Sequence, residues 1–144
     1  MIPKRLAVLV LTLLAAGAIS VLPATPASAA TPLCTGGGAV PRGTSGDLIV
    51  PVVASTNDPT CLIGDHLVGS HAAVSQLQLT MRQCYPQQLA PGFTVDGDWG
   101  PITRQTLVNI QNHVHVQPDG IYGPITRNNM FHRSADIPDK CFHY

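Results

Sequence analysis

The sequence predicts a mainly α fold, in which a compact three-helix module follows an N-terminal β-hairpin and is stabilised by disulfides. Three observations support this prediction. Apolar side chains recur at helical spacing in the second half of the chain, a nine-residue motif occurs there twice, and four cysteines follow an apolar leader. The 144-residue chain then divides into a leader at 1–30, a linker and hairpin at 31–69, a helical domain at 70–133 and a tail at 134–144.

An internal repeat organises the helical domain. The segment Asp96–Arg104, with sequence DGDWGPITR, recurs 23 residues later as Asp119–Arg127, with sequence DGIYGPITR. In each copy Asp-Gly predicts a tight turn, because glycine adopts positive φ without steric cost. Gly-Pro predicts a helix start, since proline is favoured at the first helical position. Each copy therefore encodes a turn, an aromatic residue and the beginning of a helix.

Apolar spacing locates the three helices. The first is predicted over about 71–84, where Val74, Leu77 and Met81 are three and four residues apart and share one helix face. The same spacing follows the first copy of the motif, at Leu107, Ile110 and Val114. The third helix is short: it follows the second copy, contains Met130 and Phe131, and ends near His132.

In this order the motifs resemble the peptidoglycan-binding domain family. The similar features are Val74-x-x-Leu77-Gln78, the first copy, Leu107-x-x-Ile110-Gln111 and the second copy. The resemblance spans about 70–133 and implies a compact three-helix module of the kind usually appended to bacterial cell-wall hydrolases. Met130 and the loop 85–94, with extra Pro and Gln, depart from the family's usual pattern.

The leader predicts export. Lys4 and Arg5 precede an apolar run of about 14 residues and the small-residue segment Ala27-Ser28-Ala29, the pattern of a bacterial signal peptide cleaved after Ala29 or Ala30. The alternative is an uncleaved anchor, but a spanning helix needs about 20 apolar residues. We therefore expect a secreted protein, extracellular or associated with the cell wall.

Four cysteines in an exported chain predict two disulfides. They are Cys34, Cys61, Cys84 and Cys141. Three pairings are possible, and we favour Cys34–Cys61 with Cys84–Cys141, because the second bond would tie the end of the first helix to the tail. Zinc is the rival interpretation, but no two cysteines have the short spacing of zinc ligands.

The segment before the helices is less regular. Residues 31–46 are rich in Gly, Pro, Ser and Thr and predict a loose linker. Residues 48–54 are apolar and β-branched and contain Pro51, which predicts an edge strand. Its expected hairpin partner is 61–63, after a turn at 55–59.

The composition does not favour catalysis. The chain contains no Glu, and its eight Asp residues lie mostly in turn contexts, so the paired carboxylates of a glycosidase are missing. The six histidines show no metal-binding spacing: His66, His71, His113, His115, His132 and His143. We therefore expect no catalytic residue, cofactor or metal. Without Lys4 and Arg5 of the leader, the chain has six basic and eight acidic residues. This balance argues against binding to nucleic acid or to an anionic membrane. We expect the protein to be a monomer.

Binding is better supported than catalysis. Each copy of the motif supplies an aromatic ring that can stack on a sugar and an arginine that can hold a carboxylate. The candidate ligand-binding residues are Asp96, Trp99, Arg104, Asp119, Tyr122 and Arg127. The alternative is structural: the aromatic rings anchor the turns, and the aspartates pair with the arginines.

The sequence therefore favours a secreted, non-catalytic protein that binds the glycan or the stem peptide of peptidoglycan. A small secreted cell-wall hydrolase is one alternative. A secreted protein-binding or inhibitor module on the same disulfide scaffold is the other.

Overall fold

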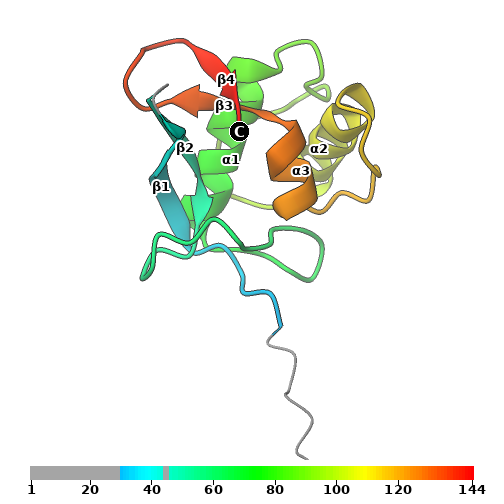
Figure 1. The fold of residues 1–144 in the computed structure, drawn as a ribbon. Coiled ribbons are helices and arrows are strands. Elements are labelled where there is room, and N and C mark those ends of the chain that lie inside the picture. Colours follow the sequence, from blue (N-terminus) through cyan, green and yellow to red (C-terminus); the bar gives the residue numbers. More distant parts are fainter. Residues whose placement is uncertain (1–29, 44–45) are drawn as a thin grey trace, which may run out of the picture.

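The computed structural model describes residues 30–43 and 46–144. Three helices lie beside one antiparallel sheet (Figure 1). The helices are α1 (His71–Cys84), α2 (Pro101–His113) and α3 (Pro124–Asn129). The strands are β1 (Gly36–Pro41), β2 (Asp47–Val52), β3 (Phe131–Ser134) and β4 (Cys141–His143), hydrogen-bonded in the order β1-β2-β3-β4. The signal peptide predicted for 1–30 lies outside the described residues except for Ala30.

Helix α1 is central, with the sheet on one side and α2 and α3 on the other (Figure 1). Ser70 caps its start, accepting a hydrogen bond from the Ala73 N–H at 3.2 Å. The apolar face of α1 is fully buried together with residues of α2, of the second motif copy and of the end of α3: Ala73, Val74, Leu77, Met81, Leu107, Ile110, Tyr122 and Met130. The predicted bounds of α1, residues 71–84, are confirmed.

The prediction of a mainly α fold is wrong, because strands form on both sides of the helical segment. After α3 the backbone becomes extended at Met130, whose side chain is fully buried, so the third helix stops at Asn129. Phe131–Ser134 then pairs with β2, and the predicted tail contributes β4. The sequence predicted that Met130 and Phe131 belong to the third helix because they are apolar. In the structure Met130 is buried with an extended backbone, and Phe131 begins β3.

The strand predicted to pair with residues 48–54 in the hairpin is also wrong. Strand β2 pairs with Gly36–Pro41, inside the predicted linker, and not with 61–63. The glycines of β1 permit close packing, since a Cβ at Gly37 would lie 2.8 Å from the Gln76 side chain. Strand β2 is internal despite Pro51 because β3 pairs only with Leu48 and Ile49, which leaves the backbone at Pro51 with one neighbouring strand.

Both favoured disulfides are confirmed. Cys34 bonds Cys61, and Cys84 at the end of α1 bonds Cys141 in β4, with Cα–Cα distances of 5.0 and 5.8 Å. The first bond closes a loop within residues 31–69, which we call the N-terminal extension, and both of its cysteines are buried in the core. The second fixes β4, and hence the edge of the sheet, to α1.

His132 in β3 is fully buried beside the Tyr122 ring, and its Nε2 contacts the Arg127 carbonyl at 3.0 Å. Burial lowers the pKa of His132 from 6.5 to about 4. Between these values the unfolded chain takes up a proton that the folded chain does not. The free energy of unfolding should therefore fall as the pH drops from about 6.5 to about 4, by roughly 3 kcal/mol in total.

Denaturant unfolding at several pH values measures this slope, and His132→Gln should flatten it even if the variant is less stable at neutral pH. The Asp96 carboxylate, with a pKa near 2, titrates below this window. An unchanged slope in His132→Gln would assign the pH dependence to other groups.

Candidate ligand-binding site

The first Asp-Gly turn is held by a buried glutamine of α1. The Gln78 Nε2 donates to the Asp96 carboxylate at 2.8 Å, to the Asp98 carbonyl at 3.1 Å and to the Thr103 hydroxyl at 3.1 Å. Its Oε1 accepts the backbone N–H groups of Asp96 and Gly97, at 3.1 and 2.7 Å. One side chain thus satisfies the polar groups of the turn and joins them to the start of α2.

The second turn has the same clamp, supplied by α2. The Gln111 Nε2 donates to the Asp119 carboxylate, the Ile121 carbonyl and the Thr126 hydroxyl, at 2.8–3.1 Å. Its Oε1 accepts the Gly120 N–H at 2.9 Å. The two turns are therefore built alike, although their glutamines are not equally far from them along the chain.

The glycines of both turns have positive φ, as predicted. Gly97 has φ +80° and Gly120 has φ +74°. A side chain at Gly97 would overlap the His71 ring, and one at Gly120 would lie 2.9 Å from Arg104 Nε. Both positions therefore require glycine for conformation and for space.

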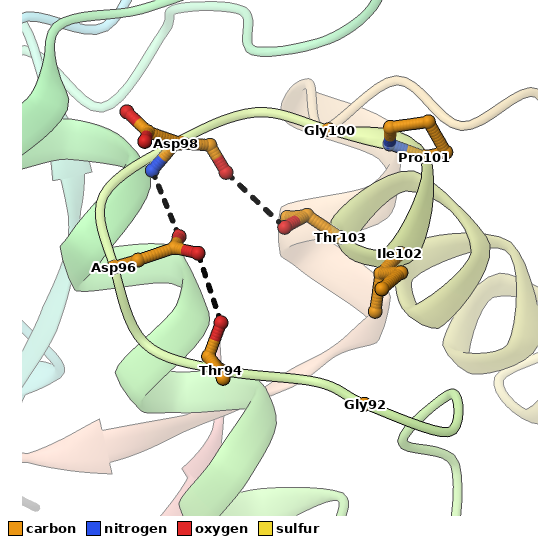
Figure 2. A pocket seen from close by; sticks show the side chains of 8 residues that line it. All are labelled: Gly92, Thr94, Asp96, Asp98, Gly100, Pro101, Ile102 and Thr103. Atoms are coloured by element: carbon orange, nitrogen blue, oxygen red, sulfur yellow. Dashed lines mark hydrogen bonds between the residues drawn. The ribbon is translucent and has the colours of Figure 1, made fainter.

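A shallow depression lies beside each turn, at equivalent positions of the two copies. The first has a volume of about 140 Å³ and lies between the turn Asp96–Asp98 and the start of α2 (Figure 2). Its wall is partly apolar, because Ile102 projects from the first turn of α2 and is 45% exposed. The second has a volume of about 170 Å³ and is also bordered by Leu62 of the N-terminal extension.

The two aromatic residues differ in accessibility. Tyr122 is fully buried, and its backbone N–H and carbonyl pair with those of Ile63 at 2.8 and 2.9 Å. Burial raises the pKa of Tyr122 far above its usual range. Trp99 is only partly buried, and its indole N–H donates to the Asp65 carboxylate at 3.0 Å. Trp99 is therefore partly exposed, whereas Tyr122 belongs to the core.

The two arginines differ in the same way. Arg104 is about 39% exposed, with its Nε 2.7 Å from Asp65 Oδ2 and its NH2 3.1 Å from the Asp119 carbonyl. Arg127 is 7% exposed; it donates to the Pro59 carbonyl and lies over the Tyr144 ring at 4.3 Å. Each arginine thus reaches a carbonyl of another segment, but only Arg104 keeps a solvent-exposed guanidinium.

The carboxylates of Asp96 and Asp119 hold their turns in place. Asp96 also accepts the Asp98 N–H at 3.0 Å and the Thr94 hydroxyl at 2.8 Å (Figure 2). The hydrogen bond from Gln78 is the main cause that lowers the pKa of Asp96 to about 2. Asp119 does not pair with Arg127 through its carboxylate; the carboxylate caps its own turn by accepting the Ile121 N–H at 2.8 Å.

The six predicted site residues are therefore not equivalent. The structure brings Trp99 and Arg104 together on one exposed carboxylate, uses Asp96 and Asp119 to build turns, and buries Tyr122 and Arg127. Sequence reasoning missed Asp65, which lies 34 residues before Trp99, and it gave no role to the glutamines. The repeated Val-x-x-Leu-Gln and Leu-x-x-Ile-Gln segments were the available signal for the glutamines. Among the described residues, no three His, Cys or Asp side chains are placed to hold a metal.

Gln78→Leu should destabilise the fold by about 2–4 kcal/mol, because it leaves the buried Gly97 N–H and its neighbours without a partner. Gln105→Leu is the matched control, since Gln105 lies exposed on α2 and bonds only Asn109. The control should shift the free energy of unfolding by no more than about 0.5 kcal/mol. Thermal or urea unfolding compares the two, and equal stabilities would contradict the clamp.

The repeat arginines should respond differently to the same change. Arg104→Ala should alter stability by about 0.5 kcal/mol, as is usual for a surface ion pair. Arg127→Ala should cost about 2–3 kcal/mol, because it removes charge-assisted hydrogen bonds to the Pro59 carbonyl and the Asn128 side chain, and the cation over Tyr144. Urea unfolding of both variants tests this order, and a larger loss for Arg104→Ala would refute it.

Comparison with known protein families agrees with this geometry. The family described as "Putative peptidoglycan binding domain" matches residues 70–130, from the N-cap of α1 to Met130. The matched segment contains all three helices, both glutamine clamps and both copies of the motif. Neither the curated proteins nor the solved structures contain a match to the chain. Residues 70–130 of the chain are therefore similar to the putative peptidoglycan binding domain family.

Proposed function

We propose that this is an exported, non-catalytic protein that binds peptidoglycan through the surface of its first motif copy. The match of residues 70–130 to a peptidoglycan-binding family carries the proposal. The geometry supports this location, because the first copy keeps a partly exposed indole, a partly exposed arginine and a depression bordered by Ile102.

We assign the six candidate residues accordingly. Trp99 and Arg104 contact the ligand, and Asp96 borders the depression while holding the turn. Asp119, Tyr122 and Arg127 support the surface from the second copy, where Tyr122 and Arg127 are buried and the Asp119 carboxylate bonds Gln111 and its own turn. Muramyl glycans and stem peptides present sugar faces and carboxylates, the groups that an indole and an arginine recognise.

The absence of catalysis is supported by the state of the carboxylates. A glycosidase needs a carboxylic acid with a raised pKa as proton donor. The chain has no Glu, and the pKa values of Asp65 and Asp96 are both lowered by hydrogen bonds. These two groups remain anionic at neutral pH and suit binding better than proton transfer.

Export is supported by the covalent structure. Two disulfides persist in oxidising compartments, which agrees with the leader of the sequence. Of the helices in the described ranges, none has the length and apolar character needed to cross a bilayer.

Sedimentation with purified cell walls tests this function, using protein that lacks the leader. The parent should co-sediment, and Arg104→Ala should weaken binding about tenfold or more while the melting curve stays nearly unchanged. Arg82→Ala is the matched control, because it removes an exposed arginine of α1 that lies outside the proposed surface.

Two outcomes would contradict the proposal. A parent protein that stays in the supernatant would end the binding function. Walls that lose turbidity during incubation would show hydrolysis, and the chain would then be an enzyme.

A further inference from the structure

Asp65 of the N-terminal extension is fixed close to the first motif copy. It lies in the tight turn from Gly64 to Leu67, whose backbone groups bond each other at 3.0 and 3.1 Å. The neighbouring Ile63 pairs with Tyr122 through both of its backbone groups. The backbone at Asp65 is therefore anchored on the second copy, while its side chain reaches the first. Asp65 also lies outside the family match, so this contact is a feature of the extension.

Both oxygens of this carboxylate are engaged by the first copy. Oδ1 accepts the Trp99 indole N–H at 3.0 Å, and Oδ2 forms an ion pair with the Arg104 Nε at 2.7 Å. Two donors thus converge on one carboxylate, the arrangement by which proteins hold a carboxylate ligand. The site is defined by the donors and does not depend on which molecule supplies the acceptor.

The contact is open to exchange. The side chains of Arg104 and Asp65 are 39% and 52% exposed, and ion pairs at such positions contribute little to stability. Rotation of the Asp65 side chain would free both donors without moving the backbone. Arg104 would remain placed by its bond to the Asp119 carbonyl, and Trp99 by its packing on the core.

We propose that Trp99 and Arg104 form a carboxylate-binding site for which Asp65 is a built-in competitor. A ligand carboxylate, such as that of a peptidoglycan stem peptide, binds by displacing the Asp65 side chain. The identity of that ligand rests on the proposed function, whereas the site itself rests on the three residues. Competition from Asp65 therefore weakens the binding of a simple carboxylate. It favours ligands that make further contacts in addition to the carboxylate.

Among the described residues, the second copy has no carboxylate contact of this kind. Its arginine, Arg127, is only 7% exposed and donates to the Pro59 carbonyl and to the side-chain oxygen of Asn128. Its aromatic residue, Tyr122, is fully buried. The competition is confined to the first copy.

Tryptophan fluorescence tests the proposal without cell walls, because Trp99 is the only tryptophan of the chain. The probe is N-acetylalanine, which carries a carboxylate, and N-acetylalaninamide is its neutral control at matched ionic strength. Asp65→Ala should respond to N-acetylalanine at a concentration at least about fivefold lower than the parent needs, since a surface ion pair of about 1 kcal/mol would be removed. The amide should change neither protein.

Asp65→Ala/Arg104→Ala should lose the gained response, and Asp65→Asn should fall between the parent and Asp65→Ala because an amide still accepts one hydrogen bond. Circular dichroism checks that each variant is folded. Equal responses of parent and Asp65→Ala would overturn the proposal, as would a response that survives the loss of Arg104. Wall sedimentation of the parent is a separate measurement, so a failure of peptidoglycan binding and a failure of the competition are distinguishable.

Discussion

Two buried glutamines organise this protein. Each places one amide in the centre of an Asp-Gly turn, where it accepts backbone N–H groups and donates to a carboxylate, a carbonyl and a threonine hydroxyl. The threonine lies in the first turn of the following helix, so the clamp fixes the direction in which that helix leaves the turn. Helix packing, the depressions beside the turns and the positions of the aromatic and arginine side chains all depend on this network. A fully satisfied buried network of this kind also specifies one conformation, because any alternative leaves polar groups unpaired.

The clamp explains why the motif recurs while the segments before it differ. Eighteen residues separate Gln78 from Asp96, and eight separate Gln111 from Asp119. Gln78 lies in the middle of α1 and Gln111 near the end of α2, so the clamp requires a helix face beside the turn and leaves the length of the intervening chain free to vary. The loop 85–94 fits in the first interval, where the Ala90 N–H bonds the Thr106 hydroxyl at 3.0 Å.

The helices were predictable because their signals are local. Apolar spacing located α1, and the Gly-Pro pairs located the starts of α2 and α3. The disulfide pairing followed from an expected proximity of helix end and tail. The sheet was not predictable in the same way, since Gly36–Pro41 has no alternating pattern and forms a strand only because β2 pairs with it. Only part of the candidate site could be predicted from the sequence. Trp99 and Arg104 follow from the motif, whereas Asp65 reaches them through a long-range contact that no local pattern encodes.

The same nine-residue motif thus forms two different surfaces, and the difference comes from outside the motif. The extension presses Ile63 and Pro59 against the second copy, which buries Tyr122 and Arg127 and makes them part of the core. Against the first copy it places the side chain of Asp65, and Trp99 and Arg104 stay partly exposed. Sequence identity between repeats therefore shows a shared frame and does not show a shared role. The segment that packs on each copy decides which residues stabilise the fold and which remain available to a ligand.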